Sequence, residues 1–366
     1  MMPALYIHIP FCQKKCPYCS FAVVVGQCSK MADYIQALLS EAQVYRGCCV
    51  STVYVGGGTP SLLDVENITI LSEGLSANFS VKGCEATFEF NPESVSRLKA
   101  GHVRACGFNR ASLGLQSFHG SYLSYLGRSH TDQEGFSAFQ VLREAGFDNI
   151  SIDLMFGFPE QTEAQLDVDI DAAIALKSEH ISIYALTVEA RSLFEVRGEM
   201  MEDERQALLY RRVLARLKNA GFEQYEVSNF ARPGFASRHN MNYWQGGDYI
   251  ALGMGAHGHL DGERYWNAET FPRYLQLMQE SRSAVVGRER LAAPEKMMEC
   301  LLFGLRMNRG VDLQVLEQRF HVGFGQATLD EIECLTAEGL LIKDGSCVLA
   351  TDAGRLLLDA ISVKLV

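Results

Sequence analysis

Three cysteines lie within eight residues near the start of the chain, in the segment Cys12-Gln13-Lys14-Lys15-Cys16-Pro17-Tyr18-Cys19. Thiolates are soft ligands that bind zinc, copper(I) or iron–sulfur clusters. A closed zinc site and a closed [4Fe–4S] cubane each take four protein ligands. The position at which a further Cys-x-Cys step would fall holds Phe21. An iron–sulfur cluster held by this loop would therefore keep one iron open to an exchangeable small molecule.

Two other interpretations of the cysteine loop stay open on spacing alone. A zinc site could be completed by His8, just before the loop, or by Cys28. The grouping could also be chance, because the chain has 11 cysteines and those outside the loop are scattered singly, apart from Cys48-Cys49. Scattered cysteines behave as small buried hydrophobic residues. The odd number of cysteines fits reduced thiols and metal ligation better than a disulfide scaffold.

Length and composition limit the class of protein. A chain of 366 residues has room for one large α/β domain and a smaller one. The net charge of −11 argues against nucleic acid or an anionic membrane surface as the main partner. The sequence contains neither a secretory signal pattern nor an apolar run of about 18 residues. We therefore expect a cytoplasmic protein with no stable membrane insertion.

Short β-branched runs alternate with longer stretches of helical periodicity, as in repeated βα units around a parallel sheet. The expected strands are Leu5–Ile9, Thr52–Val55, Ala86–Phe90, Arg110–Leu115, Ser151–Phe156 and Ile181–Leu186. The expected helices are Lys30–Tyr45, Asp64–Asn78, Val95–Ala105, Gln133–Ala145 and Glu163–Leu176. These units predict an α/β fold with an incomplete (β/α)6 TIM-like barrel.

Groups of the kind that bind ligands recur where the expected strands end or run buried. The second strand ends in Gly56-Gly57-Gly58-Thr59-Pro60, the third carries Glu89, the fourth is followed by Gln116, and the fifth contains Asp153 in an apolar run. Each of these is, taken alone, more often a tight turn, a helix cap or a satisfied core group. Because chemistry in parallel sheets occurs at the carboxyl ends of the strands, the set together predicts a ligand site there.

These residues, with Tyr6-Ile7-His8-Ile9-Pro10-Phe11-Cys12, resemble the radical S-adenosylmethionine (SAM) superfamily over residues 4 to about 260. The resemblance is closest to the branch that contains the oxygen-independent coproporphyrinogen III oxidases and the HemW haem chaperones. It implies that Cys12, Cys16 and Cys19 ligate a [4Fe–4S] cluster whose open iron is chelated by SAM. In enzymes of this type an electron from the cluster cleaves the sulfonium, so an electron donor is also implied.

The resemblance also implies a SAM pocket, with Gly58 and Thr59 facing a second ligand. The implied pocket residues are Tyr6, Tyr18, Gly57, Gly58, Thr59, Glu89, Gln116, Arg128, Asp153 and Ala185.

Three features separate the chain from the oxidases of this branch. Phe21 stands where the oxidases have a further cysteine, and the first strand follows the first few residues directly, whereas the oxidases carry a long segment before it. The segment His239-Asn240-Met241-Asn242-Tyr243-Trp244 fits the His-Asn-x-x-Tyr-Trp motif of HemW proteins. The resemblance associates His239 with haem, with His257 and His259 as rival ligands, although a histidine in a polar turn is more often a hydrogen-bonded structural residue.

We therefore expect a haem chaperone that carries haem to an acceptor haemoprotein, with an oxygen-independent coproporphyrinogen III oxidase as the alternative and a zinc-stabilised barrel as a third reading. Whether the chain is an enzyme, and whether it forms a homodimer, stay open. The expected domains are a radical SAM barrel over 1–230, a linker or extension over 231–295, and a small α+β, winged-helix-like domain over 296–366. In this last domain, two short strands are expected at Leu340–Lys343 and Cys347–Ala350.

Overall fold

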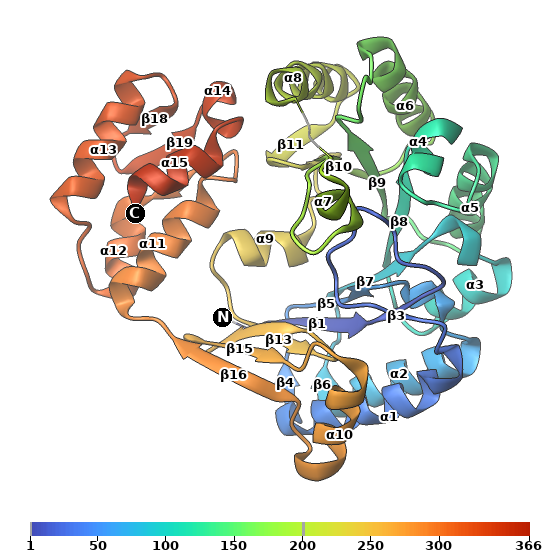
Figure 1. Ribbon diagram of the computed structural model, residues 1–366. Helices are drawn as coiled ribbons and strands as arrows, with labels where there is room; N and C mark the ends of the chain where they lie inside the picture. Colours follow the sequence, from blue (N-terminus) through green and yellow to red (C-terminus); the bar gives the residue numbers. More distant parts are fainter. Residues whose placement is uncertain (1, 200–201) are drawn as a thin grey trace.

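A parallel sheet forms the centre of the molecule (Figure 1). The computed structural model describes residues 2–199 and 202–366. Six strands pair in parallel and in chain order, which confirms the predicted partial barrel, and their ends differ from the predicted ones by at most two residues. These strands are β1 (Ala4–Ile9), β5 (Thr52–Gly57), β7 (Glu85–Phe90), β8 (Arg110–Gln116), β9 (Ile150–Phe156) and β10 (His180–Ala185).

Helices follow the strands and cover the outside of the barrel (Figure 1). Two of them begin at capping boxes, Thr131 with Glu134 and Thr162 with Gln165. In each box the threonine side chain accepts a hydrogen bond from the backbone of the second residue, whose side chain accepts one from the threonine backbone. The helices of this part are α1 (Met31–Ala42), α2 (Val65–Asn78), α3 (Arg97–Ala105), α4 (Gly120–Tyr125), α5 (Asp132–Glu144), α6 (Glu163–Ala175), α7 (Leu193–Arg197) and α8 (Asp203–Asn219). Short strands β2 (Phe11–Cys12) and β3 (Val24–Val25) pair with each other, as do β4 (Cys48–Cys49) and β6 (Phe79–Ser80).

The sheet continues beyond the barrel at both edges. At one edge, β13 (Tyr249–Leu252) pairs in parallel with β1, and three antiparallel strands follow it. The additional strands are β14 (His257–Leu260), β15 (Glu263–Asn267) and β16 (Val285–Arg290) at this edge, and β12 (Asn229–Ala231) and β11 (Glu223–Glu226) at the other. The segment 231–295, predicted as a linker or extension, thus supplies strands to the same sheet, and the three domain boundaries stay a prediction.

A buried carboxylate joins this extension to α1. Glu41 is 4% exposed and accepts hydrogen bonds from the Gly253 backbone nitrogen (2.9 Å), from Asn267 Nδ2 (2.6 Å) and from the Tyr274 hydroxyl (2.7 Å). Tyr274 lies on α10 (Phe271–Ser281). Burial raises the pKa of Glu41 to about 7. One side chain therefore ties a helix of the barrel to the end of β13, to β15 and to α10.

The C-terminal part has its own hydrophobic core and a three-stranded sheet in the order β17-β19-β18. The strands β18 (Leu341–Asp344) and β19 (Cys347–Ala350) confirm the predicted hairpin. The other elements are α11 (Ala293–Gly304), β17 (Val311–Asp312), α12 (Leu313–Phe320), α13 (Gln326–Ala337), α14 (Asp352–Arg355) and α15 (Leu358–Leu365). Among the described residues, no helix has both the length and the apolar character that crossing a membrane requires.

The C-terminal part docks on the barrel through polar contacts. Arg306 lies 3.2 Å from the fully buried Glu226, and its guanidinium stacks 4.5 Å from the ring centre of Trp244. Asn308 Nδ2 donates to the Gln224 carbonyl at 2.6 Å. Trp244 ends helix α9 (Arg238–Trp244), which lies between the barrel and the C-terminal part (Figure 1).

Candidate functional site

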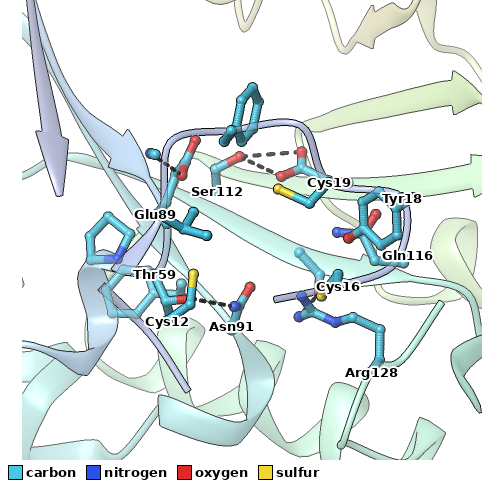
Figure 2. Close-up of a pocket in the computed structure, with 18 of the residues that line it drawn as sticks. Cys12, Cys16, Tyr18, Cys19, Thr59, Glu89, Asn91, Ser112, Gln116 and Arg128 are labelled. Carbon is cyan, nitrogen blue, oxygen red and sulfur yellow. Dashed lines mark hydrogen bonds between the residues drawn. The ribbon is translucent and has the colours of Figure 1, made fainter. Parts of the chain in front are cut away.

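A cavity of about 580 Å³ opens at the carboxyl ends of the six parallel strands. Figure 2 shows that groups from the cysteine loop face groups from β5, β7 and β8 across it. Of the predicted cluster and pocket residues, all but Tyr6 line this cavity: Cys12, Cys16, Tyr18, Cys19, Gly57, Gly58, Thr59, Glu89, Gln116, Arg128, Asp153 and Ala185. The hydroxyl of Tyr6 is 3.0 Å from His8 Nδ1, and its ring stacks on Tyr54, so Tyr54 presents the surface to the cavity instead.

The three cysteines of the loop are unbonded thiols that line the cavity. Cys12 Sγ lies 3.7 Å from Thr59 Oγ1, and burial raises the pKa of the Cys12 thiol to about 11. In this conformation no three His, Cys, Asp or Glu side chains of the described residues converge closely enough to hold a metal ion. Phe21, where a fourth cysteine would follow, is 61% exposed.

Glycine is required at the end of β5, because the backbone there lies too close to His8 and Pro10 to leave room for a side chain. Gly57 has φ +112°, and a Cβ there would meet the His8 ring at 2.6 Å. A Cβ on Gly58 would meet the Pro10 carbonyl oxygen at 2.8 Å. The Gly57 backbone nitrogen donates to Glu89 Oε2 at 3.2 Å. These glycines thus bring β5 close to the start of the cysteine loop and also hold a carboxylate of the cavity.

Two partly buried carboxylates line the cavity. Glu89 Oε1 accepts from the Tyr54 hydroxyl at 2.7 Å, and burial raises the pKa of Glu89 to about 7, with a further contribution from Asp153. The two oxygens of Asp153 accept from Ser112 Oγ at 3.2 and 3.0 Å, and burial raises its pKa as well. A carboxylate buried in this way is stabilised in its charged form by a cationic or hydrogen-bond-donating ligand.

Cationic and amide groups line the cavity beside Cys16 and Tyr18 (Figure 2). Arg128 donates to the Gly114 carbonyl at 3.0 Å and lies 3.6 Å from Glu93 Oε2. Gln116 has φ +68° at the bulge between β8 and β9, where a residue other than glycine is strained. The Nε atoms of Arg110 and Arg128 are buried without an acceptor among the described residues. The cavity is thus lined by both guanidinium groups and carboxylates.

Comparison with known proteins places this site in a family. A model of the radical SAM superfamily matches residues 6–173, and a model of the HemN C-terminal domain matches residues 291–357. The chain is 32% identical over 369 residues to "Heme chaperone HemW" of Bacillus subtilis (strain 168), covering 97% of both chains. The chain belongs to the HemW family. The "Heme chaperone HemW" of Mycobacterium tuberculosis (strain ATCC 25618 / H37Rv) is 35% identical over 370 residues, covering 98% of this chain and 93% of that one.

The HemW-family chain shares its fold with a solved oxidase. The structure described as "Coproporphyrinogen III oxidase (HemN) from Escherichia coli is a Radical SAM enzyme" superposes with a TM-score of 0.87 at 25% sequence identity, over 100% of this chain and 90% of that one. This likeness confirms the radical SAM type of partial barrel with a small C-terminal domain.

Membership of the radical SAM superfamily implies a [4Fe–4S] cluster and SAM. It therefore favours these groups over the hypothesis of a zinc-stabilised barrel. The donor set fits these groups. Thiolates are the usual ligands of iron–sulfur clusters. SAM carries an amino group, a carboxylate, a sulfonium and ribose hydroxyls, which complement the carboxylates of Glu89 and Asp153 and the guanidinium groups of Arg110 and Arg128 that line the cavity.

The histidine of the HemW motif lies outside this cavity. His239 on α9 is 1% exposed, and its ring is held by Thr52 Oγ1 at Nδ1 (2.7 Å) and by the Tyr243 hydroxyl at Nε2 (2.9 Å). Burial and the charge of Arg110 lower the pKa of His239 to about 3, so the ring is neutral. In the described conformation neither ring nitrogen is free for iron, which favours the structural reading of His239, and its role as a haem ligand stays a prediction.

Several lining residues were missed in the sequence. On β8 the residues Arg110, Ser112 and Gly114 line the cavity together with the predicted Gln116, and this alternation with a period of two was a readable signal. Asn91, which donates to Thr59 Oγ1 at 3.1 Å, follows β7 directly. Other missed residues, Tyr54, Ser182 and Tyr184, lie on strands without a comparable signal.

Proposed function

We propose that the chain is a haem chaperone, which binds haem and passes it to an acceptor haemoprotein. The observation that carries this proposal is the similarity to HemW chaperones along nearly the whole of both chains. Phe21 supports it, because the resemblance gives the oxidases a cysteine at this position. The proposal includes an electron donor for the cluster, a cytoplasmic location and the option of a homodimer.

Within this function we propose that Cys12, Cys16 and Cys19 ligate a [4Fe–4S] cluster and that SAM lies in the cavity beside it. The cluster, when bound, supplies an electron and an open iron. Glu89 would then accept hydrogen bonds from the amino group of SAM, while Arg128 would bind an acceptor oxygen. The described contacts support these roles, because each group lines the same cavity and is already oriented by the protein.

The test is a transfer assay with anaerobically reconstituted protein. Haem-loaded protein is mixed with an apo-haemoprotein, and the absorbance of the haem-bound acceptor is followed. We expect faster loading of the acceptor than with an equal concentration of haem on serum albumin. Equal rates would contradict the chaperone proposal.

A second candidate is an oxygen-independent coproporphyrinogen III oxidase, which the likeness to the HemN structure favours. Reduced, reconstituted protein is incubated anaerobically with coproporphyrinogen III and SAM. We expect no protoporphyrinogen, and its stoichiometric formation would replace the chaperone proposal with the oxidase.

A further inference from the structure

A second cavity of about 870 Å³ lies between the sheet extension and the C-terminal part. One wall comes from the end of α9 and from β13, β14 and β15, and the other from α11 and α12. It shares none of its lining residues with the first cavity. Cofactor sites usually have about 300–1,000 Å³, so the space is sufficient for a large planar ligand.

Aromatic rings line much of this second cavity. Tyr243 meets Tyr249 edge to face, with 4.7 Å between the ring centres. Trp266 stacks with His257 at 6.2 Å and 20°, while Phe303 and Phe320 face them from the C-terminal helices. Aromatic and apolar walls with a few polar groups are typical of sites that bind a large flat macrocycle.

One histidine of this cavity is oriented as metal-bound histidines usually are. His259 Nδ1 lies 3.4 Å from Asp248 Oδ1, and both residues line the cavity. A carboxylate beside one ring nitrogen is typical of metal-bound histidines, and here it would leave Nε2 for the iron; the His259 ring also contacts the Gly247 backbone. His257 is more exposed and forms no ion pair among the residues that the structure describes.

The basic residues of the cavity suit a ligand with carboxylate arms. Lys296 on α11 forms no ion pair within the described part of the chain, whereas Glu299 on the same helix also lines the cavity and is paired with Arg264. Arg319 on α12 donates to the backbone carbonyls of Gln245 and Gly246, which leaves its charge without a carboxylate partner. A ligand anion between α11 and α12 would therefore meet two cations.

Helix α9 contacts the wall that carries His259 through a chain of aromatic side chains. The Tyr243 hydroxyl lies 2.9 Å from His239 Nε2, and the Tyr243 ring packs on Tyr249, which in turn lies 6.1 Å from the His259 ring. His239 is thus connected to the cavity through two tyrosines while remaining buried itself. This arrangement gives the buried histidine of the motif a positioning role.

We propose that the second cavity holds the haem, with His259 as the axial ligand of the iron and Lys296 and Arg319 near the propionates. His239 acts as a positioning residue, through Tyr243 and Tyr249. This inference rests on the proposed haem function and assigns that function to a place in the molecule.

The experiment is a titration of reconstituted full-length protein with haem, followed by the Soret band. His259→Ala should weaken binding at least tenfold and lose the histidine-ligated spectrum, and added imidazole should restore that spectrum. His239→Ala should weaken binding but keep the histidine-ligated spectrum. His102→Ala, on α3 and remote from the cavity, is the matched control and should bind as the unmodified protein does.

A second variant tests whether the second cavity itself is the space that haem occupies. Ala293 is exposed at the start of α11 and lines the cavity, so Ala293→Trp should obstruct it and weaken haem binding at least tenfold without touching His259. Unchanged affinity and spectrum in both His259→Ala and Ala293→Trp would overturn this location while leaving the haem function intact. Loss of the histidine-ligated spectrum in His257→Ala but not in His259→Ala would overturn the ligand assignment. Absence of haem binding by the unmodified protein would instead overturn the proposed function.

Discussion

Glu89 provides a test of the SAM site through pH. Burial raises its pKa to about 7, so the side chain is mostly neutral at pH 6 and mostly ionised at pH 8. If only the ionised form accepts hydrogen bonds from the amino group of SAM, the affinity should rise about tenfold between these two pH values, in step with the ionised fraction. The stability of the ligand-free protein should change in the opposite direction. Because the pKa of Glu89 is higher in the folded than in the unfolded state, the free energy of unfolding should fall as the pH rises through 7.

Glu89→Gln keeps an oxygen that can accept from Tyr54 or Gly57 but removes the charge. A hydrogen bond to a charged group contributes about 1.5–3 kcal/mol, which corresponds to an affinity lower by about 10- to 100-fold at pH 8. At pH 6 the difference should shrink to a few-fold, because Glu89 is then mostly protonated in the unmodified protein as well.

The assay is calorimetric titration of anaerobically reconstituted protein with SAM at pH 6, 7 and 8. Asp169→Asn is a matched control, since Asp169 is a buried carboxylate with a pKa of about 6 that accepts from Ser117 and Phe118 away from the cavity. It should keep the tenfold change with pH. The reasoning is refuted if Glu89→Gln shows the same pH dependence as the unmodified protein.

Three further predictions concern the cluster, the docking of the C-terminal part and the buried network. Cys16→Ala should lose the cluster, measured as iron and acid-labile sulfide, and full retention would contradict the assignment. Arg306→Ala leaves Glu226 without its cation at 3.2 Å and should speed hydrogen exchange in α11 and α12, whereas unchanged exchange would show that the ion pair does not hold the docked state. Because burial raises the pKa of Glu41 to about 7, the unfolding free energy should fall as the pH rises through 7, and Glu41→Gln should flatten this slope in urea unfolding at pH 6 and 8.

The barrel could be predicted because its signals are local. Strands such as β9 are apolar along almost their whole length, as expected for strands covered on both faces, and Thr131 and Thr162 mark helix starts by capping. The order of the parallel strands follows from repeated βα units. The placement of Glu89 and Asp153 at one cavity followed from the same rule.

The sheet extension and the burial of His239 could not be predicted, because they depend on contacts between segments that are distant in the sequence. β13 is only four residues long, and its pairing of Ala251 with Tyr6 joins positions far apart in the chain, which no local periodicity encodes. The same holds for His239, whose ring partners come from β5 and α9. The motif identified this histidine, but its burial could be seen only once β5 and α9 were placed side by side.

The walls of the second cavity belong to two parts of the chain with separate hydrophobic cores. A molecule that contacts both walls binds only when these parts are docked, so its binding free energy also stabilises the docked state. The coupling is reciprocal: whatever draws α11 and α12 away from the sheet weakens binding by the same factor. Release of a ligand from this cavity therefore requires no change in its chemical groups, since separation of the two walls would be sufficient.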